Sequence, residues 1–174
     1  MVQINLPKNS KIQKGKYYKD NTGSNNIRKV NVYRWDPSTE ENPRIDTYEV
    51  DMNNCPSKVL DILNKIKNEI DPSLAYRRSC AHGVCGSCAM NMDGKNGLAC
   101  TKPHKEIKGD INIYPLPHLK VQKDLIGDLS TLYKQYESVE PWLKNSKNIS
   151  EKENLQSKED RAKLDGLYEC IMCA

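Results

Sequence analysis

Two segments in which apolar and polar residues alternate begin the regular part of the chain. Residues 27–35 predict a strand, which the Pro-containing turn at 36–38 ends, and residues 44–52 predict a second strand. The two segments can pair as a hairpin. Their apolar and aromatic positions are Val30, Val32, Tyr33, Trp35, Ile45, Tyr48 and Val50.

Apolar residues change to helical spacing after Pro56. Residues 59–70 place an apolar side chain on one face at every third or fourth position, so a helix is predicted there. The dipeptide Asp71-Pro72 ends it. Short strands are predicted at 89–92 and 110–114. A turn is predicted over 91–97, because Asp-Gly and Asn-Gly dipeptides favour positive φ.

The second half of the chain predicts helices. Residues 121–139 carry an apolar stripe of helical period, residues 144–156 are a polar linker, and residues 157–168 predict a third helix. Ser157 and Asp160 have the spacing of a capping box at its start. The fold class expected is therefore α+β. We expect a polar arm over 1–26, a first domain over 27–120 and a helical segment over 121–174.

The chain offers little material for a hydrophobic core. Leu, Ile and Val make up 35 of its 174 residues, and Phe is absent. So thin a core favours support from a metal centre or a partner chain. The seven cysteines are an odd number and too few for a disulfide scaffold. No apolar signal sequence follows Met1, so we expect a reducing compartment, where spaced cysteines favour metal binding.

Positive charge is concentrated at the start of the chain. The net charge is +4, and residues 1–30 hold seven basic residues against one acidic residue. We interpret the arm over 1–26 as a solvated segment, with docking to an acidic partner or to lipid as the functional alternative. Nucleic acid is not expected as a partner, because only Tyr17 and Tyr18 lie among these charges.

Four cysteines form the strongest chemical signal. Cys80, Cys85, Cys88 and Cys100 have the spacing C-x4-C-x2-C-x11-C, which is the plant-type [2Fe–2S] pattern. Gly83 lies between the first two cysteines, and Gly86 lies between the next two. Both allow tight bends that aim backbone amides at sulfur.

Three other interpretations of these cysteines stay open: a structural zinc site, disulfides, and buried structural cysteines. Zinc sites usually pair two short Cys-x2-Cys knuckles, whereas here three cysteines share one loop. Ser87 is a candidate hydrogen-bond donor to one of the sulfurs.

Other candidate residues carry weaker signals. Cys170 and Cys173 form a second Cys-x2-Cys, which is half of a zinc knuckle, a redox pair or the first half of a cluster motif. Cys55 is interpreted as an ordinary small residue. Arg77, Arg78 and His82 flank the first cysteine, where they either raise the reduction potential of a cluster or contact a partner or solvent. His104 and His118 are assigned to the surface or to packing.

Several segments together resemble the iron–sulfur subunit family of succinate dehydrogenase, the respiratory complex II. The resemblance runs from about residue 27 to the last residue. The segments that carry it are Arg77-Arg78-Ser79-Cys80, Gly83-Val84-Cys85-Gly86-Ser87-Cys88-Ala89-Met90-Asn91, Tyr33-Arg34-Trp35-Asp36-Pro37, Leu98-Ala99-Cys100-Thr101, Tyr114-Pro115-Leu116-Pro117 and Asp165-Gly166-Leu167-Tyr168-Glu169-Cys170-Ile171.

This resemblance implies a β-grasp [2Fe–2S] ferredoxin domain followed by the start of a helical domain. Cys80, Cys85, Cys88 and Cys100 would bind the [2Fe–2S] cluster, and Cys170 and Cys173 match the first two ligands of a [4Fe–4S] cluster. The family also holds a [3Fe–4S] cluster. No residue of this chain would act on succinate. Ala81-His82 departs from the Arg-Glu of many relatives, which leaves the potential of the first cluster open.

The resemblance further implies partners and a location. Electrons would pass from an FAD-containing flavoprotein subunit, through the clusters, to quinone at membrane anchor subunits. The chain would be peripheral on the cytoplasmic side of a bacterial inner membrane, or on the matrix side of the mitochondrial inner membrane. We expect a truncated subunit, with a split subunit completed by a second chain as the alternative. A fumarate reductase subunit, a free-standing [2Fe–2S] ferredoxin and a zinc-stabilised interaction module are the other functions left open.

Overall fold

The computed structural model describes residues 11–39, 41–53, 55–140, 142 and 155–165. The described residues up to Asp128 form one compact unit, and those from Leu129 onward form a second. In the described parts, no helix has the length and apolar character needed to cross a bilayer.

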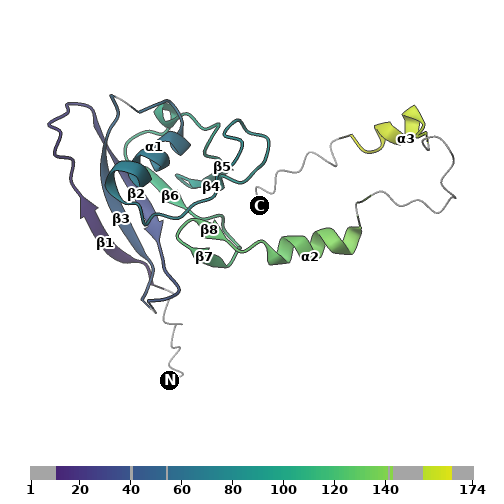
Figure 1. The fold of residues 1–174 in the computed structure, drawn as a ribbon, viewed down its shortest axis with the longest axis horizontal. Coiled ribbons are helices and arrows are strands. Elements are labelled where there is room, and N and C mark those ends of the chain that lie inside the picture. Colours follow the sequence, from purple (N-terminus) through teal and green to yellow (C-terminus); the bar gives the residue numbers. More distant parts are fainter. Residues whose placement is uncertain (1–10, 40, 54, 141, 143–154, 166–174) are drawn as a thin grey trace, which may run out of the picture. The chain divides into compact units, whose positions relative to one another are not determined.

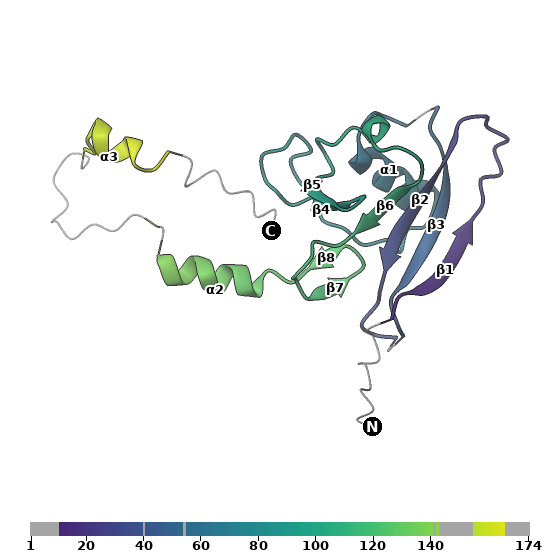
Figure 2. The ribbon, with the colours of Figure 1, turned by 180° about the vertical axis from the view of Figure 1, so that it is seen from behind.

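A six-stranded mixed sheet is the frame of the first unit (Figures 1 and 2). The strands lie in the order β1-β3-β2-β6-β4-β5. β2 and β3 pair antiparallel over eight residue pairs, which confirms the predicted hairpin. The pairs β1–β3 and β2–β6 are parallel, and β4 pairs antiparallel with both β5 and β6. The strands are β1 Gln13–Tyr18, β2 Ile27–Arg34, β3 Arg44–Asp51, β4 Ala89–Met92, β5 Lys95–Leu98 and β6 Ile111–Tyr114.

A helix supplies the other half of the core. α1, Val59–Lys65, continues as a π-helical turn over Ile66–Ile70, and together they confirm the predicted helix. Its apolar stripe is buried together with the inward residues of the strands, so helical and strand periodicities meet in one core. The largest fully buried side chains are Tyr48, Ile62, Leu63, Ile66, Leu74, Met90, Ile111, Ile113, Val30, Val32, Val50 and Val59.

The alternation along β2 and β3 also places charged side chains in the protein interior. On β2, the buried positions Val30 and Val32 are followed by Arg34, which is 3% exposed. On β3, Asp46 precedes the buried Tyr48 and Val50 and is fully buried. Because side chains two apart on a strand share a face, both charged groups lie in line with the core.

The expected arm over 1–26 is partly wrong. Residues 13–18 form β1, which pairs in parallel with β3, and the ring of Tyr18 stacks on that of Tyr48 at 4.6 Å between centroids. Residues 13–18 do not alternate between apolar and polar, so their sequence pattern does not predict a strand. Backbone pairing with β3 holds β1 in place. Residues 1–10 lie outside the described residues.

The helix predicted over 121–139 is wrong over residues 121–129. β7, Val121–Lys123, and β8, Ile126–Gly127, pair as a small hairpin, and the helix α2 covers only Ser130–Val139. Asp124 adopts a positive φ of 46° between the two strands, which a helix interior does not allow. Its amide donates to the carbonyl of Trp35, a tertiary hydrogen bond that sequence periodicity cannot reveal.

The turn predicted over 91–97 is shorter than expected. Asp93 and Gly94 both have positive φ and connect β4 directly to β5. Residues 95–98, most of which we expected within the turn, pair with β4 as a strand. The Asp-Gly dipeptide therefore marks the turn, whereas Asn96-Gly97 lies in the ladder.

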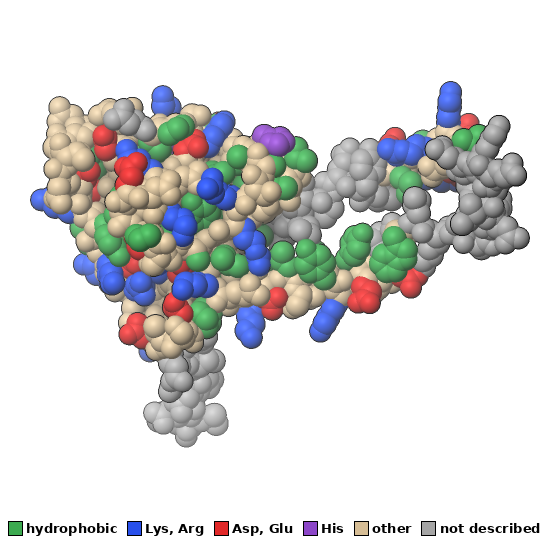
Figure 3. Space-filling view, in the orientation of Figure 1, with side chains coloured by type: hydrophobic (Ala, Val, Ile, Leu, Met, Phe, Trp, Pro, Cys, Tyr) green, Lys and Arg blue, Asp and Glu red, His purple; other side chains and the backbone are tan. Residues whose placement is uncertain are grey.

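The second unit contains α2 and α3, Lys158–Ala162. The Ser157 hydroxyl accepts a hydrogen bond from the Asp160 amide at 3.0 Å, as the capping pattern predicts. Residues 166–168 of the predicted third helix lie outside the described residues. Figure 3 shows apolar side chains along α2, where Tyr133 and Tyr136 are more than half exposed. Exposed aromatic side chains of this kind are typical of a surface that another chain or segment covers.

Candidate metal centre

Backbone amides converge on the sulfur of the first cysteine in the loop. The amides of His82, Val84 and Cys85 lie 3.4–3.5 Å from Cys80 Sγ. These three donors lower the pKa of the Cys80 thiol to about 6, the His82 amide contributing most. Since only the thiolate binds metal, the loop favours the metal-binding form of this residue.

Left-handed backbone conformations turn those amides inward. Ala81, Gly83 and Gly86 have φ values of 62°, 87° and 72°. Residues of alternating hand are typical of backbone nests that bind anions. A Cβ atom on Gly83 would lie 2.8 Å from Thr101 Cγ2, so the Thr101 side chain would have to shift to admit one. The expectation that glycine permits these bends is confirmed.

Ser87 lies beside the second cysteine. Its Oγ is 2.9 Å from Cys85 Sγ, which is the contact proposed from the sequence. This hydroxyl, followed by the Cys80 amide, lowers the pKa of the Cys85 thiol. Cys85 and Val84 are exposed, so this edge of the loop lies at the protein surface.

The third and fourth cysteines lie deeper. Cys88 and Cys100 are 3% and 5% exposed, and burial raises the pKa of the Cys88 thiol to about 11. The N-terminus of α1 holds the turn after β5 that carries Cys100, because the amides of Leu60 and Val59 donate to the carbonyls of Ala99 and Lys102. First-turn amides of a helix have no partner within the helix, so this turn of chain satisfies them.

The four thiols come together as two pairs. The amides of Cys80 and Cys85 each donate to the sulfur of the other residue, at 3.5 and 3.4 Å, and the Cys88 thiol lies near that of Cys100. Within the described ranges, no three or more His, Cys, Asp or Glu side chains gather at a single metal position. Two thiol pairs fit a [2Fe–2S] cluster, in which each of the two irons takes two thiolates. The donor amides, the bends and the donor chemistry all fit a [2Fe–2S] cluster.

The remaining sequence candidates lie elsewhere. Cys55 is partly buried and lines a surface hollow with Met52, Ser57 and His104. His104 is buried as a packing residue, and His118 is exposed. Cys170 and Cys173 lie outside the described residues.

The positive residues beside the loop differ in their contacts. Arg77 donates to the carbonyl of Gly127 at 2.7 Å, whereas Arg78 and His82 are exposed. A role of Arg77, Arg78 and His82 in cluster potential stays a prediction.

Sequence reasoning missed a buried charged network. Arg34 lies among the carboxylates of Asp46, Asp71 and Asp124, all of them at least 94% buried. One signal was present: the alternation of β2 assigns Arg34 to the inward face, where an arginine needs buried acidic partners. Tyr33, Trp35 and Pro37 served to predict a strand and its end, whereas Arg34 received no role of its own.

Comparisons with known proteins agree with this site. Residues 29–134 match the family described as "2Fe-2S iron-sulfur cluster binding domain". The succinate dehydrogenase iron-sulfur subunit of Paracoccus denitrificans is 60% identical over all 174 residues, which cover 67% of that protein.

A solved structure gives the same result. A chain of the Mycobacterium smegmatis Sdh1 complex in the apo form aligns with a TM-score of 0.74 and 26% identity, over 86% of this chain. The present chain spans 62% of that chain's length. The expected α+β fold with a ferredoxin-type domain is confirmed. The chain belongs to the succinate dehydrogenase iron–sulfur subunit family.

Proposed function

We propose that this chain binds a [2Fe–2S] cluster through Cys80, Cys85, Cys88 and Cys100 and transfers electrons as a subunit of succinate dehydrogenase. The observation that carries the proposal is the arrangement of the four thiols as two pairs, with three backbone amides directed at one sulfur. When bound, such a cluster supplies one-electron transfer. Membership of the family supports the wider assignment.

The residues of this chain would hold and tune that centre. The amides around Cys80 and the hydroxyl of Ser87 would offset the negative charge on sulfur, which is costly to bury. The buried position of Cys88 would keep water from one side. The exposed edge at Val84, which is 69% exposed, supports electron exchange with a partner at this surface.

The same proposal extends to the partners. Electrons would arrive from an FAD-containing flavoprotein subunit and leave toward quinone at membrane anchor subunits, so the chain would be peripheral to the membrane. The cytoplasmic side of a bacterial membrane is proposed, with the matrix side of the mitochondrial inner membrane as the alternative. Cys170 and Cys173 would supply two of the four thiolates of a [4Fe–4S] cluster, and a [3Fe–4S] cluster would complete the relay.

Two alanine variants test the ligand set. Cys88→Ala should abolish the visible absorption and the EPR signal of the reduced cluster, whereas Cys55→Ala should retain both, because Cys55 lines a different hollow. Retention of the cluster in Cys88→Ala would contradict the assignment. Co-expression with a flavoprotein subunit tests the second part: co-purification supports the subunit role, and a free monomer with an intact cluster would support the ferredoxin alternative.

A further inference from the structure

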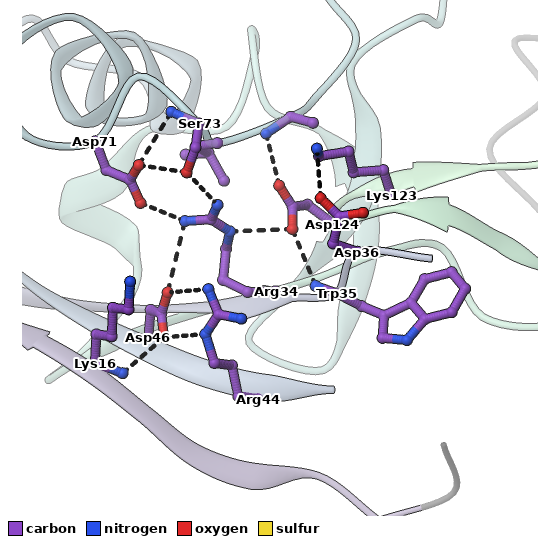
Figure 4. Close-up of polar contacts among 12 residues, drawn as sticks. Lys16, Arg34, Trp35, Asp36, Arg44, Asp46, Asp71, Ser73, Lys123 and Asp124 are labelled. Atoms are coloured by element: carbon purple, nitrogen blue, oxygen red, sulfur yellow. Dashed lines mark hydrogen bonds and ion pairs between the residues drawn. The ribbon is translucent and has the colours of Figure 1, made fainter. Parts of the chain in front are cut away.

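A chain segment without regular structure leads into the candidate cluster loop. Residues 71–79 contain neither a helix nor a strand, yet they connect the end of the α1 region to Cys80. Because no ladder of backbone hydrogen bonds fixes this segment, its position depends on side-chain contacts. From the helical region, Lys67 Nζ donates to the carbonyls of Pro72 and Leu74, and the Tyr76 hydroxyl donates to Asn64 Oδ1. Further side-chain contacts come from the buried charged network, drawn in Figure 4.

Arg34 occupies the centre of that network. Its Nε lies 3.0 Å from Asp124 Oδ1, its Nη1 contacts Asp71 Oδ2, and its Nη2 donates to Ser73 Oγ at 2.8 Å. Asp71 also accepts from the Tyr48 hydroxyl at 2.9 Å. Arg34 therefore holds the beginning of the segment from inside the core.

Asp124 connects three parts of the first unit. Its Oδ1 accepts from the amide of Trp35 at 3.0 Å, and its Oδ2 accepts from the amide of Ala75 at 2.9 Å. The amide of the next residue, Leu125, donates back to the carbonyl of Ala75 at 3.2 Å. Ala75 is thus bound at both its donor and its acceptor by the β7–β8 hairpin, five residues before Cys80.

Arg77 repeats the same attachment closer to the loop. Its Nη1 donates to the carbonyl of Gly127, the last residue of β8, at 2.7 Å. The hairpin therefore holds the segment at residues 75 and 77. This second attachment lies three residues before the first cysteine, Cys80.

Asp46 provides an internal comparison within the same network. It is as deeply buried as Asp124 and lies 3.6 Å from Arg34, but it accepts from the amide of Lys16 at 2.8 Å and pairs with Arg44. The Lys16 contact holds β1, and Figure 4 shows Asp46 with Lys16 and Arg44 on the other side of Arg34 from Asp124. Loss of either carboxylate removes one buried charge, but the two carboxylates hold different segments.

We propose that Asp124 is a positioning residue for the cluster loop, which acts through Ala75 and, with Arg77, fixes the chain that carries Cys80. The inference rests on the proposed [2Fe–2S] ligand set. Three buried carboxylates around one arginine are costly to desolvate, and an apolar core would be cheaper. What the polar network adds is a fixed direction for a segment that has no ladder of its own.

Asp124→Asn and Asp46→Asn in the full chain form the matched test. Both should lower the midpoint of urea unfolding. Only Asp124→Asn should change the visible circular dichroism and the EPR line shape of the cluster, and only it should raise amide exchange at residues 75–77, by roughly tenfold. Arg77→Lys keeps the charge but not the planar guanidinium, and it should shift the same spectra. If Asp124→Asn does not fold, this variant tests whether the β7–β8 hairpin positions the cluster loop.

The outcomes separate the two proposals. A wild-type cluster with identical spectra in Asp124→Asn, or equal changes in both variants, would overturn the positioning role and leave the ligand set intact. A wild-type chain without iron would overturn the ligand set, while amide exchange at residues 75–77 would still decide whether Asp124 holds the segment.

Discussion

The Oγ atom of Ser87 lies 2.9 Å from the sulfur of Cys85. Electron density on a cluster sulfur rises upon reduction, so a hydrogen bond to it stabilises the reduced form more than the oxidised form. We expect Ser87→Ala to retain the cluster and to lower its reduction potential by less than about 59 mV, the tenfold change of a one-electron couple. A redox titration followed by EPR measures this.

The exposed Ser79 is the control for that prediction. Ser79→Ala also removes a hydroxyl beside a cysteine and should leave the potential unchanged. An unchanged potential in Ser87→Ala would show that the hydroxyl is not directed at a cluster sulfur.

Substitutions at Gly83 and Ala81 should have opposite effects on the same loop. Gly83→Ala adds a Cβ at a φ of 87° and 2.8 Å from Thr101 Cγ2, so the iron content should fall well below that of the wild type. Ala81→Gly relieves a left-handed alanine, worth about 1–2 kcal/mol, which exceeds the added entropy of the unfolded chain. It should raise the free energy of unfolding by about 0.5 kcal/mol. Iron analysis and urea titration check the pair, and equal effects of the two changes would contradict it.

Gly15 determines whether β1 stays on the sheet. A Cβ atom there would lie 2.1 Å from Asp46 Oδ1 and 2.6 Å from the carbonyl oxygen of Ile45. Gly15→Ala should therefore detach β1 and expose residues 13–18 to limited proteolysis, whereas the neighbouring Lys14→Ala should not. Equal resistance of both variants would show that β1 stays paired with a side chain at position 15, which contradicts this prediction.

Asp71 makes stability depend on pH. Burial acts to raise the pKa of this carboxyl, but hydrogen bonds from Ser73, Arg34 and Tyr48 outweigh burial and hold the pKa well below its usual range. A depressed pKa in the folded state gives stability that is fully present above the unfolded value of about 3.9 and is lost as the pH falls below it. Asp71→Asn should therefore cost about 3 kcal/mol at pH 7, and the difference from wild type should shrink on acidification.

Urea titrations of both proteins from pH 7 downward measure that difference. Asp36→Asn is the control. Hydrogen bonds from Lys123 and Ser38 also lower the pKa of Asp36, but this ion pair is partly exposed, where salt screens the attraction, so its loss should change stability much less. A difference between wild type and Asp71→Asn that stays constant with pH would show that Asp71 is not held as a carboxylate.

The sequence predicted the parts of the fold that depend on local patterns. Alternation predicts the hairpin β2–β3, and helical spacing predicts the helix after Pro56. The spacing of the four cysteines predicts the candidate cluster loop. β1 and the β7–β8 hairpin were not predicted, because tertiary partners and not their own patterns hold them. The role of Asp124 has the same origin: the carboxylate of Asp124 contacts residues 34, 35 and 75, which lie far from it in the sequence.

Iron and acid-labile sulfide per chain, measured on the purified protein, test the central claim most directly. The account predicts about two irons and two sulfides for the four-cysteine site, with an EPR signal after reduction. A higher iron content would mean that Cys170 and Cys173 also take part in a cluster. A colourless protein that holds zinc and no sulfide would contradict the account.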